Sequence, residues 1–288
     1  MLSDQEFDQW AHRCNLSDQA KSVIEHIRSS PPARRVQSRK QNVRGHFNRS
    51  RKMAHTIQYE SRTVELPAIL LMELDDDVLE IWDQPPSFII NYKDAAGRNR
   101  GHSYTSDFFV LRQYSAGWEE WKTEEQLTDL AAKNSEKYCL GGDHRWRFPP
   151  GERHATTFGL YFHVHSSAEL DLTQLKDLKL LLPYFAGPER SQDNQLAHDA
   201  ILSTVAADPG ITMAELLTRA AGAHSHDIFR LIISRQVYVD LRRAWLGDEQ
   251  QVQIYRDKEA AGLCCKNGRY VFGDGRLTSF LFLPEGLP

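Results

Sequence analysis

The chain has 288 residues and a formal net charge of −4, and charged residues make up 26% of it. This length accommodates about two domains. No run approaches the roughly eighteen apolar residues of a membrane span, and residues 1–7 lack the basic and apolar regions of a signal peptide, which excludes membrane-spanning and secreted proteins. The cysteines are too few and too scattered for a disulfide framework and predict reduced thiols in a cytoplasm: Cys14, Cys139, Cys264 and Cys265.

Residues 1–62 are predicted to form a leader and a basic N-terminal arm. Between Arg28 and Arg62 the chain contains ten lysines or arginines and one acid, Glu60. Such a run can neutralise phosphates and release counterions, which gives salt-dependent, sequence-independent affinity for DNA. A flexible, solvated leader is the alternative. The predicted DNA contacts are Arg34, Arg35, Arg39, Lys40, Arg44, Arg49, Arg51 and Lys52.

An amphipathic helix is predicted to begin at Glu65, because apolar residues recur at helical spacing after it: Leu66, Ile69, Leu70 and Leu74. Pro67 is tolerated only in the first turn of such a helix. A carboxylate at a helix N-terminus is favoured by the macrodipole, so Glu65 has a structural explanation. The functional alternative is an acidic group that faces a metal site, with Glu60 as the second candidate. The acids within 73–80 are predicted to be a solvated helix end and turn.

Two strands and a turn follow, and they carry Asp107, Glu120 and Lys122. Side chains alternate between the two faces of a strand, so Glu120 and Lys122 point the same way. Residues 114–117 have the composition of a turn that folds the second strand back beside the first. The sequence therefore predicts that Asp107 lies next to Glu120.

Two carboxylates and a lysine in one pocket suit phosphoryl transfer. Mg²⁺ prefers hard oxygen ligands and keeps several of its waters. Such an ion lowers the pKa of a bound water and screens the charge of a phosphate. Lys122 would position or deprotonate the water, or neutralise developing charge. Taken alone, the same residues in a hairpin are also typical of a solvated surface.

Four segments, 34–45, 65–85, 104–110 and 118–122, together resemble the TnsA family, the endonuclease subunit of heteromeric transposases. The resemblance covers most of residues 30–185. It implies an α/β fold of the restriction-endonuclease type, a mixed sheet flanked by helices. It also implies catalytic roles for Glu65, Asp107, Glu120 and Lys122, with the three carboxylates as ligands of Mg²⁺, for which Mn²⁺ substitutes. Ser106 and Thr123 depart from the family pattern, in which proline is frequent at both places.

By this resemblance, the chain is expected to cut one strand, the 5′ strand, of double-stranded DNA at transposon ends in a bacterial cytoplasm, associated with the nucleoid. A TnsB-type transposase would make the other cut and the strand joining, under a TnsC-type ATPase regulator. Two alternatives stay open: a DNA-binding scaffold subunit with the nuclease fold, and a restriction or repair endonuclease.

After Lys122, Thr123 and Gln126 have the spacing of a capping box, which predicts a helix. Residues 141–151 are predicted to be a loop. Residues 158–165 are predicted to be a strand with Tyr161, His163 and His165 on one face. Since no Cys or His partner lies at finger-like spacing, a zinc site is disfavoured there. A helix over 172–185 completes the predicted nuclease domain, residues 63–187.

Residues 188–288 are predicted to form a winged helix-turn-helix-like domain for contact with a partner or with DNA. A linker of glycine, proline and polar residues comes before it. Helices are predicted over 195–206, 212–220 and 225–235, followed by a strand-like segment at 237–241. Residues 225–235 take the position of the recognition helix. Residues 266–288 receive no assignment.

Overall fold

The computed structural model describes residues 1–34, 45–48, 50–94, 96–185, 195–262, 264–266 and 269–271. The predicted contacts Arg35, Arg39, Lys40, Arg44 and Arg49 lie outside the described residues, as do the predicted linker and the segment 272–288. The chain divides into two compact units, Met1–Leu170 and Asp171–Pro288. Among the described residues, no helix is long and apolar enough to cross a membrane.

Two helices open the first unit, α1 (Asp4–Arg13) and α2 (Asp18–Ser29), where the sequence analysis expected only a leader. Ser3 caps α1 in a capping box with Glu6, and Ser17 caps α2. Each hydroxyl accepts a hydrogen bond from a backbone N–H of the first turn that has no partner within the helix. Both caps are visible in the sequence, so these helices could have been predicted.

The N-terminal helices are held by a buried ion pair. Glu80 is fully buried, and its carboxylate accepts hydrogen bonds of 3.0 Å from Nε and Nη2 of Arg28. The same carboxylate accepts 2.8 Å bonds from the backbone N–H of Leu2 and from Nε1 of Trp82. The guanidinium of Arg28 also lies 4.5 Å from the centre of the Phe7 ring. Arg28 therefore joins α2 to the sheet.

We expect Arg28→Ala to lower the free energy of unfolding by about 3 kcal/mol, because it leaves the charge of Glu80 buried without its cation. Thermal and urea unfolding of the full chain measure this. Arg13→Ala is the matched control, since Arg13 is exposed on α1. Equal stability of the two variants would contradict the assigned role of Arg28.

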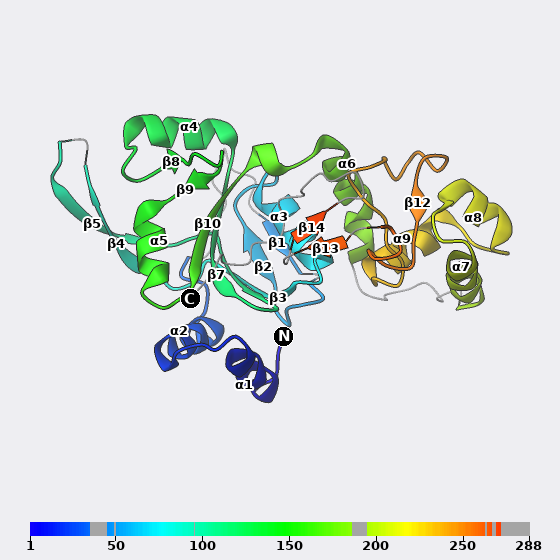
Figure 1. Cartoon of the computed structure of the whole chain (residues 1–288), viewed down its shortest axis with the longest axis horizontal. Coiled ribbons are helices and arrows are strands. Elements are labelled where there is room, and N and C mark those ends of the chain that lie inside the picture. Colours follow the sequence, from blue (N-terminus) through cyan, green and yellow to red (C-terminus); the bar gives the residue numbers. More distant parts are fainter. Residues whose placement is uncertain are drawn as a thin grey trace. The chain divides into compact units, whose positions relative to one another are not determined.

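A four-stranded mixed sheet forms the centre of the first unit, in the order β10-β7-β6-β3 (Figure 1). Its strands are β3 (Val78–Asp83), β6 (Phe108–Arg112), β7 (Ala116–Lys122) and β10 (Tyr161–Ser166). Strand β10 runs parallel to β7, and the other pairs are antiparallel. Residues 108–111 of β6 are fully buried. A mixed sheet with flanking helices agrees with the predicted nuclease core.

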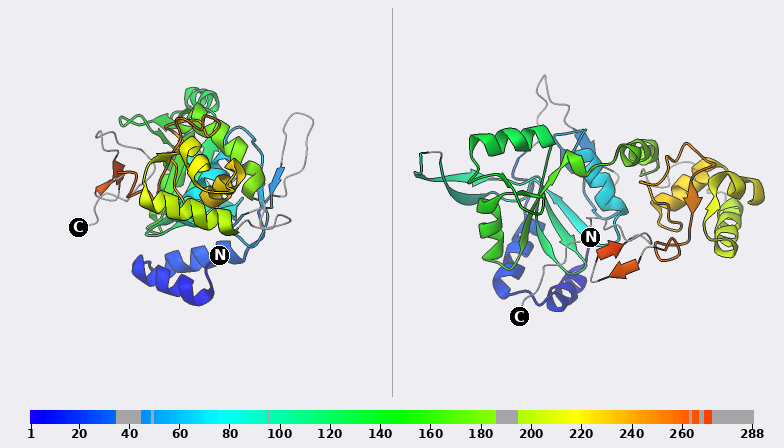
Figure 2. Two further views of the ribbon diagram at one scale, coloured as in Figure 1. Left: turned by 90° about the vertical axis from the view of Figure 1, so that its right-hand side faces the viewer. Right: turned by 45° about the horizontal axis from the view of Figure 1, so that its top comes forward.

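Helices and hairpins surround this sheet. Helix α3 (Glu65–Leu74) packs against β3 and β7, and α5 (Pro149–Thr156) packs against β10 and β4. Helix α4 (Glu124–Lys133) begins at Thr123 with the predicted capping box, which is confirmed. The two-stranded pairs are β1 (Gly45–Phe47) with β2 (Ile57–Tyr59), β4 (Phe88–Lys93) with β5 (Asn99–Tyr104), and β8 (Cys139–Leu140) with β9 (Trp146–Arg147). The hairpin β4–β5 extends away from the central sheet in Figures 1 and 2.

Three sequence predictions for residues 73–185 need correction. Residues 141–151 are not one loop, because β9 and the first turn of α5 lie within them. The helix predicted over 172–185 is α6 (Leu172–Leu181) followed by a 3₁₀ segment, Leu182–Phe185, and it belongs to the second compact unit. The acidic run after α3 is not simply solvated, since Asp75 and Asp77 both pair with Arg112.

Gly117 permits the close pairing of β7 with β10. A Cβ at this position would lie 2.2 Å from the backbone oxygen of Tyr161, so any side chain forces the two strands apart. We expect Gly117→Ala to destabilise the first unit by about 3 kcal/mol, at the upper end of the usual cost of overpacking. A Cβ at Gly142 meets nothing within 4 Å. Thermal unfolding should therefore separate Gly117→Ala from the control Gly142→Ala, and equal melting temperatures would contradict the strand pairing.

The second unit contains helices where the sequence predicts them: α7 (Gln195–Ala207), α8 (Met213–Arg219) and α9 (Ser225–Ile233). Strand β11 (Ile211–Thr212) pairs with β12 (Gln253–Ile254), and Tyr238 forms a bridge with Tyr255. Two short strands, β13 (Cys264–Lys266) and β14 (Arg269–Val271), pair further along the chain. The winged-helix assignment stays a prediction.

Candidate active site

The hairpin of β6 and β7 places Asp107 beside Glu120. Phe108 pairs with Glu119 in the antiparallel register. Asp107, which precedes Phe108, therefore lies opposite Glu120, which follows Glu119. The backbone N–H of Trp121 donates a 2.8 Å hydrogen bond to Oδ2 of Asp107. On the other side, the backbone N–H of Gln84 donates to the carbonyl of Asp107 at 2.9 Å. Asp107 is thus fixed between β3 and β7.

Lys122 and Glu120 lie on one face of β7 and form an ion pair through Nζ and Oε1. The Glu120 side chain is almost fully buried, and Lys122 keeps about a quarter of its side-chain surface exposed. Burial by itself would lower the pKa of Lys122, but the charges of Glu120 and Asp107 outweigh it and raise that pKa well above its usual value. Lys122 is therefore a firmly protonated cation beside two carboxylates.

The helix α3 brings Glu65 to the same group. Its Oε2 accepts a 2.7 Å hydrogen bond from the backbone N–H of Glu60. Burial raises the pKa of Glu65 to about 7, with further contributions from the charges of Glu60 and Glu120, while Lys122 opposes the shift. The charges of Glu120 and Lys122 act on Glu65, so Glu65 lies within electrostatic reach of the hairpin.

Crowding of the carboxylates is strongest at Asp107. Burial raises its pKa well above the usual value, and the charges of Glu120 and Glu65 add to the shift, whereas Lys122 reduces it. Carboxylates that repel one another in a buried place gain from a shared cation. The structure therefore brings together all four residues that the sequence singled out.

A hard divalent cation fits these donors. Oε2 of Glu120 is buried and has no hydrogen-bond partner within the described part of the chain, so one ligand oxygen is available. Mg²⁺ and Mn²⁺ accept carboxylate oxygens of this kind. The oxygens of Glu65, Asp107 and Glu120 do not, however, all lie within 4.8 Å of one another in the described residues, so the three carboxylates would have to draw together to share one ion.

Comparison with protein families decides the class of this domain. The model of the TnsA-like endonuclease N-terminal family matches residues 75–164, a span that includes Asp107, Glu120 and Lys122. Residues 75–164 thus match a TnsA-like endonuclease domain. This supports nuclease activity of the Tn7 transposase type, as the resemblance in the sequence predicted. No curated protein matches the chain.

The structure of the TnsA-like domain adds residues to this site that the sequence analysis missed. The Tyr104 hydroxyl lies 3.3 Å from that of Tyr138, and Nζ of Lys137 lies 3.4 Å from Nε2 of His102. Burial raises the pKa of both tyrosines, and the charge of Glu120 adds to the shift. Burial lowers the pKa of Lys137. The charge of Glu120 opposes this shift, and the charge of Lys122 adds to it. Only the fold unites these residues, since no local motif links β5 with the turn before β8.

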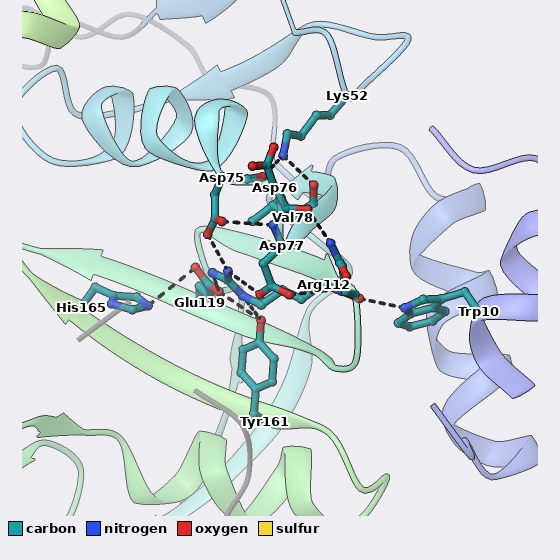
Figure 3. A network of polar contacts seen from close by, with 11 residues as sticks. Trp10, Lys52, Asp75, Asp76, Asp77, Val78, Arg112, Glu119, Tyr161 and His165 are labelled. Atoms are coloured by element: carbon teal, nitrogen blue, oxygen red, sulfur yellow. Dashed lines mark hydrogen bonds and ion pairs between the residues drawn. The ribbon is translucent and has the colours of Figure 1, made fainter. Parts of the chain in front are cut away.

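Lys52 needs correction as a DNA contact. Its side chain is buried, and its ammonium donates hydrogen bonds to the backbone carbonyls of Asp75 and Val78 (Figure 3). Lys52 therefore supplies hydrogen bonds to backbone carbonyls between α3 and β3 and contributes to the interior of the domain. Arg34 and Arg51 are exposed.

The opposite face of β7 in the TnsA-like domain holds a second polar network (Figure 3). Nη2 of Arg112 donates to Oε1 of Glu119 at 2.9 Å, and the Tyr161 hydroxyl donates to the same oxygen at 3.0 Å. Although burial would raise it, the pKa of Glu119 falls to about 2, because Arg112 and His165 lie beside it. Burial lowers the pKa of His163 to about 3, so that imidazole is neutral. This network and the nuclease group lie on opposite faces of one strand.

Proposed function

We propose that this chain is the metal-dependent DNA endonuclease subunit of a heteromeric transposase, and that it cleaves one strand, the 5′ strand, at each transposon end. The observation that supports it most is the convergence of Glu65, Asp107, Glu120 and Lys122 at a TnsA-like domain. Helix α3, the start of β6 and strand β7 bring three carboxylates and one cation together. Crowding buried charges in this way costs stability and is typical of functional sites.

Glu65, Asp107 and Glu120 would hold Mg²⁺ or Mn²⁺, which supplies a water of lowered pKa and screens phosphate charge. Asp107 is held by the N–H of Trp121, so one of its oxygens is oriented before an ion arrives. Glu120 lies between Asp107 and Lys122, and it can exchange its ion pair with Lys122 for a metal ligand bond. Preorganised ligands of this kind lower the reorganisation needed during the reaction.

Lys122 acts as a cation in this proposal. Its raised pKa makes the neutral amine rare while Glu120 and Asp107 are ionised, so it is poorly suited to remove a proton from water. An ammonium beside the carboxylates can instead neutralise charge that develops on the phosphate. Lys137 lies close enough for Glu120 to affect its pKa and offers a second cation for the DNA backbone.

DNA and the partner proteins would contact other parts of the chain. Double-stranded DNA at the transposon ends is the substrate, and the exposed Arg34 and Arg51 belong to the basic arm that would follow its backbone. A TnsB-type transposase and a TnsC-type ATPase regulator are the proposed protein partners. The second unit has the order α7, β11, α8, α9, β12, which supports a winged-helix-like domain for these contacts.

The leading alternative is a DNA-binding scaffold subunit that keeps the nuclease fold without the reaction. Retention of all four charged groups favours the nuclease, since a scaffold has no use for three crowded carboxylates. A restriction or repair endonuclease would use the same chemistry, and only its substrate differs.

Cleavage mapping on a transposon-end duplex tests the proposal. The two strands are labelled separately and incubated with Mg²⁺, the full chain, and a TnsB-type transposase whose own active site has been inactivated. We expect cuts in the 5′ strand alone, at the transposon end. Cuts at random positions would point to a general nuclease, and no cut with any divalent metal would favour the scaffold.

A further inference from the structure

A second group of potential metal ligands lies behind the nuclease residues, on the other face of β7. Within the described parts of the chain, ligand atoms of Glu119, His163 and His165 all lie within 4.8 Å of one another. In the parallel register of β10 and β7, His163 pairs with Glu119 and His165 with Trp121, so all three ligands share one face. Figure 3 shows His165 directed at Glu119 across the sheet.

Two of these ligand atoms are buried without a hydrogen bond. Oε2 of Glu119 and Nε2 of His165 have no such partner among the described residues, although they lie 3.6 Å apart. Glu119 is fully buried, and His165 exposes only 7% of its surface. The other Glu119 oxygen is already occupied by Arg112 and Tyr161. Orphaned polar atoms are costly in a protein interior, so this pair calls for an occupant.

Glu169 sets the orientation of His165. Its Oε2 lies 2.9 Å from Nδ1 of His165, while its Oε1 accepts a hydrogen bond from the backbone N–H of Ser166. A proton on Nδ1 is then held by Glu169, and the lone pair of Nε2 faces Glu119. Histidine ligands of metals are commonly held in this way by a carboxylate on their other nitrogen.

The local charge also favours a cation. Glu119, Glu169, Asp75 and Asp77 surround this place, and Arg112 is the cation that pairs with three of them. A divalent ion between Glu119 and His165 would reduce the excess of negative charge. The alternative to a metal ion is a single proton on Nε2 of His165. His165 and Glu119 would then form an ion pair, but their separation of 3.6 Å is too long for a hydrogen bond.

We propose that Glu119, His163 and His165 bind a transition-metal ion of the zinc class, with Glu169 as the group that orients His165. Two imidazoles and one carboxylate suit Zn²⁺, whereas Mg²⁺ prefers oxygen ligands. The 3.6 Å between Glu119 and His165 is close to the separation of two ligands on one zinc ion. His163 is stacked on Tyr161 with ring centres 4.2 Å apart, and one of its ring nitrogens already lies within 4.8 Å of ligand atoms of the other two residues.

Such an ion would join β10 to β7 directly behind Glu120, so its role is structural. It differs in place and in ligand chemistry from the proposed nuclease metal. If no metal binds here, the proposed nuclease function is unaffected. If the chain is not a nuclease, this second metal site is equally unaffected.

Metal titration of the full chain tests the inference. The protein is stripped with a chelator and carries Asp107→Asn, which weakens the nuclease site, and it is titrated with Zn²⁺ by calorimetry and with Co²⁺ by visible absorption. We expect one Zn²⁺ per chain, a rise in melting temperature, and Co²⁺ bands of a nitrogen and oxygen site. Excess Mg²⁺ should not displace either ion.

Variants of the ligands decide the assignment. His163→Gln and His165→Gln should each weaken Zn²⁺ binding by at least about 10-fold. His226→Gln is the matched control, because His226 is an exposed histidine that also lies beside a carboxylate, that of Asp227. Since His165 is buried, His163→Gln serves if the other variant does not fold. Unchanged Zn²⁺ affinity in both variants, or no binding by the parent chain, means that the group holds a proton and overturns the inference.

Discussion

Asp107→Asn should abolish strand cleavage at a transposon end while the fold is retained. The amide keeps an oxygen for the N–H of Trp121, so the hairpin of β6 and β7 keeps its hydrogen bond. It removes the charge that a divalent metal needs. We expect the single-turnover rate to fall on the order of 10³-fold or more, as is usual when one member of a cooperating catalytic unit is lost.

Stability separates this effect from misfolding. Burial and the charges of Glu120 and Glu65 raise the pKa of Asp107, so between its unfolded and folded pKa the folded protein binds a proton that the unfolded chain has released. Above the unfolded pKa of about 4, stability of the metal-free protein therefore falls as pH rises toward the folded pKa. Asp107→Asn cannot titrate and so lacks this pH-dependent loss of stability. Its melting temperature near neutral pH should equal or exceed that of the parent chain.

Asp129→Asn is the matched control for this variant, since Asp129 is exposed on α4. It should cleave at the rate of the parent chain. Normal cleavage by Asp107→Asn would remove Asp107 from the site. A loss of cleavage together with a large loss of stability would show a structural role instead.

Lys122→Met should retain metal binding and lose cleavage, because the ammonium acts on charge at the phosphate and not as a metal ligand. We expect a fall of about 10² to 10³-fold in the single-turnover rate, the usual cost of removing one preorganised charge or donor. Mn²⁺ titration by calorimetry, beside the cleavage assay, measures both properties. Mn²⁺ affinity should be equal or higher, since Lys122 no longer competes for Glu120.

Lys133→Met controls for the loss of a surface lysine, since Lys133 is exposed at the end of α4. It should leave both properties unchanged. Cleavage by Lys122→Met at the parent rate would make Lys122 a partner of Glu120 alone, without a part in the reaction.

Much of the nuclease group was accessible from the sequence because it depends on local rules. Alternation along a strand places Glu120 and Lys122 on one face, and a short turn returns β7 to β6, which brings Asp107 alongside. The helix start at Glu65 followed from apolar spacing, and α3 does begin there. In each of these cases the deciding partners lie within one helix or one hairpin.

Contacts between distant strands could not be read in this way. Glu119 and His163 are brought together by the parallel register of β7 and β10, which local patterns do not specify. In the sequence alone, His163 and His165 are therefore two alternating histidines without an evident partner. Arg112 and Lys52 show the same limit, because each pairs with groups near the end of α3 that are far away along the chain.

The N-terminal helices were missed for a different reason. Their capping serines are plain in the sequence, but the basic residues that follow drew attention to the segment as an arm. Arg28, counted there as part of the arm, is instead held by the buried Glu80. Charge alone therefore did not separate a cation that binds within the protein from one available to DNA.

The most direct test of the central claim is the single-turnover rate of 5′-strand cleavage at a labelled transposon end, measured against Mg²⁺ concentration with the inactivated TnsB-type partner present. The proposed site predicts no cleavage in chelator, a saturable rise in rate with Mg²⁺, and no rise at any concentration for Asp107→Asn. Cleavage that persists in chelator, or that Asp107→Asn carries out at the parent rate, would contradict a metal-dependent nuclease site at Glu65, Asp107, Glu120 and Lys122.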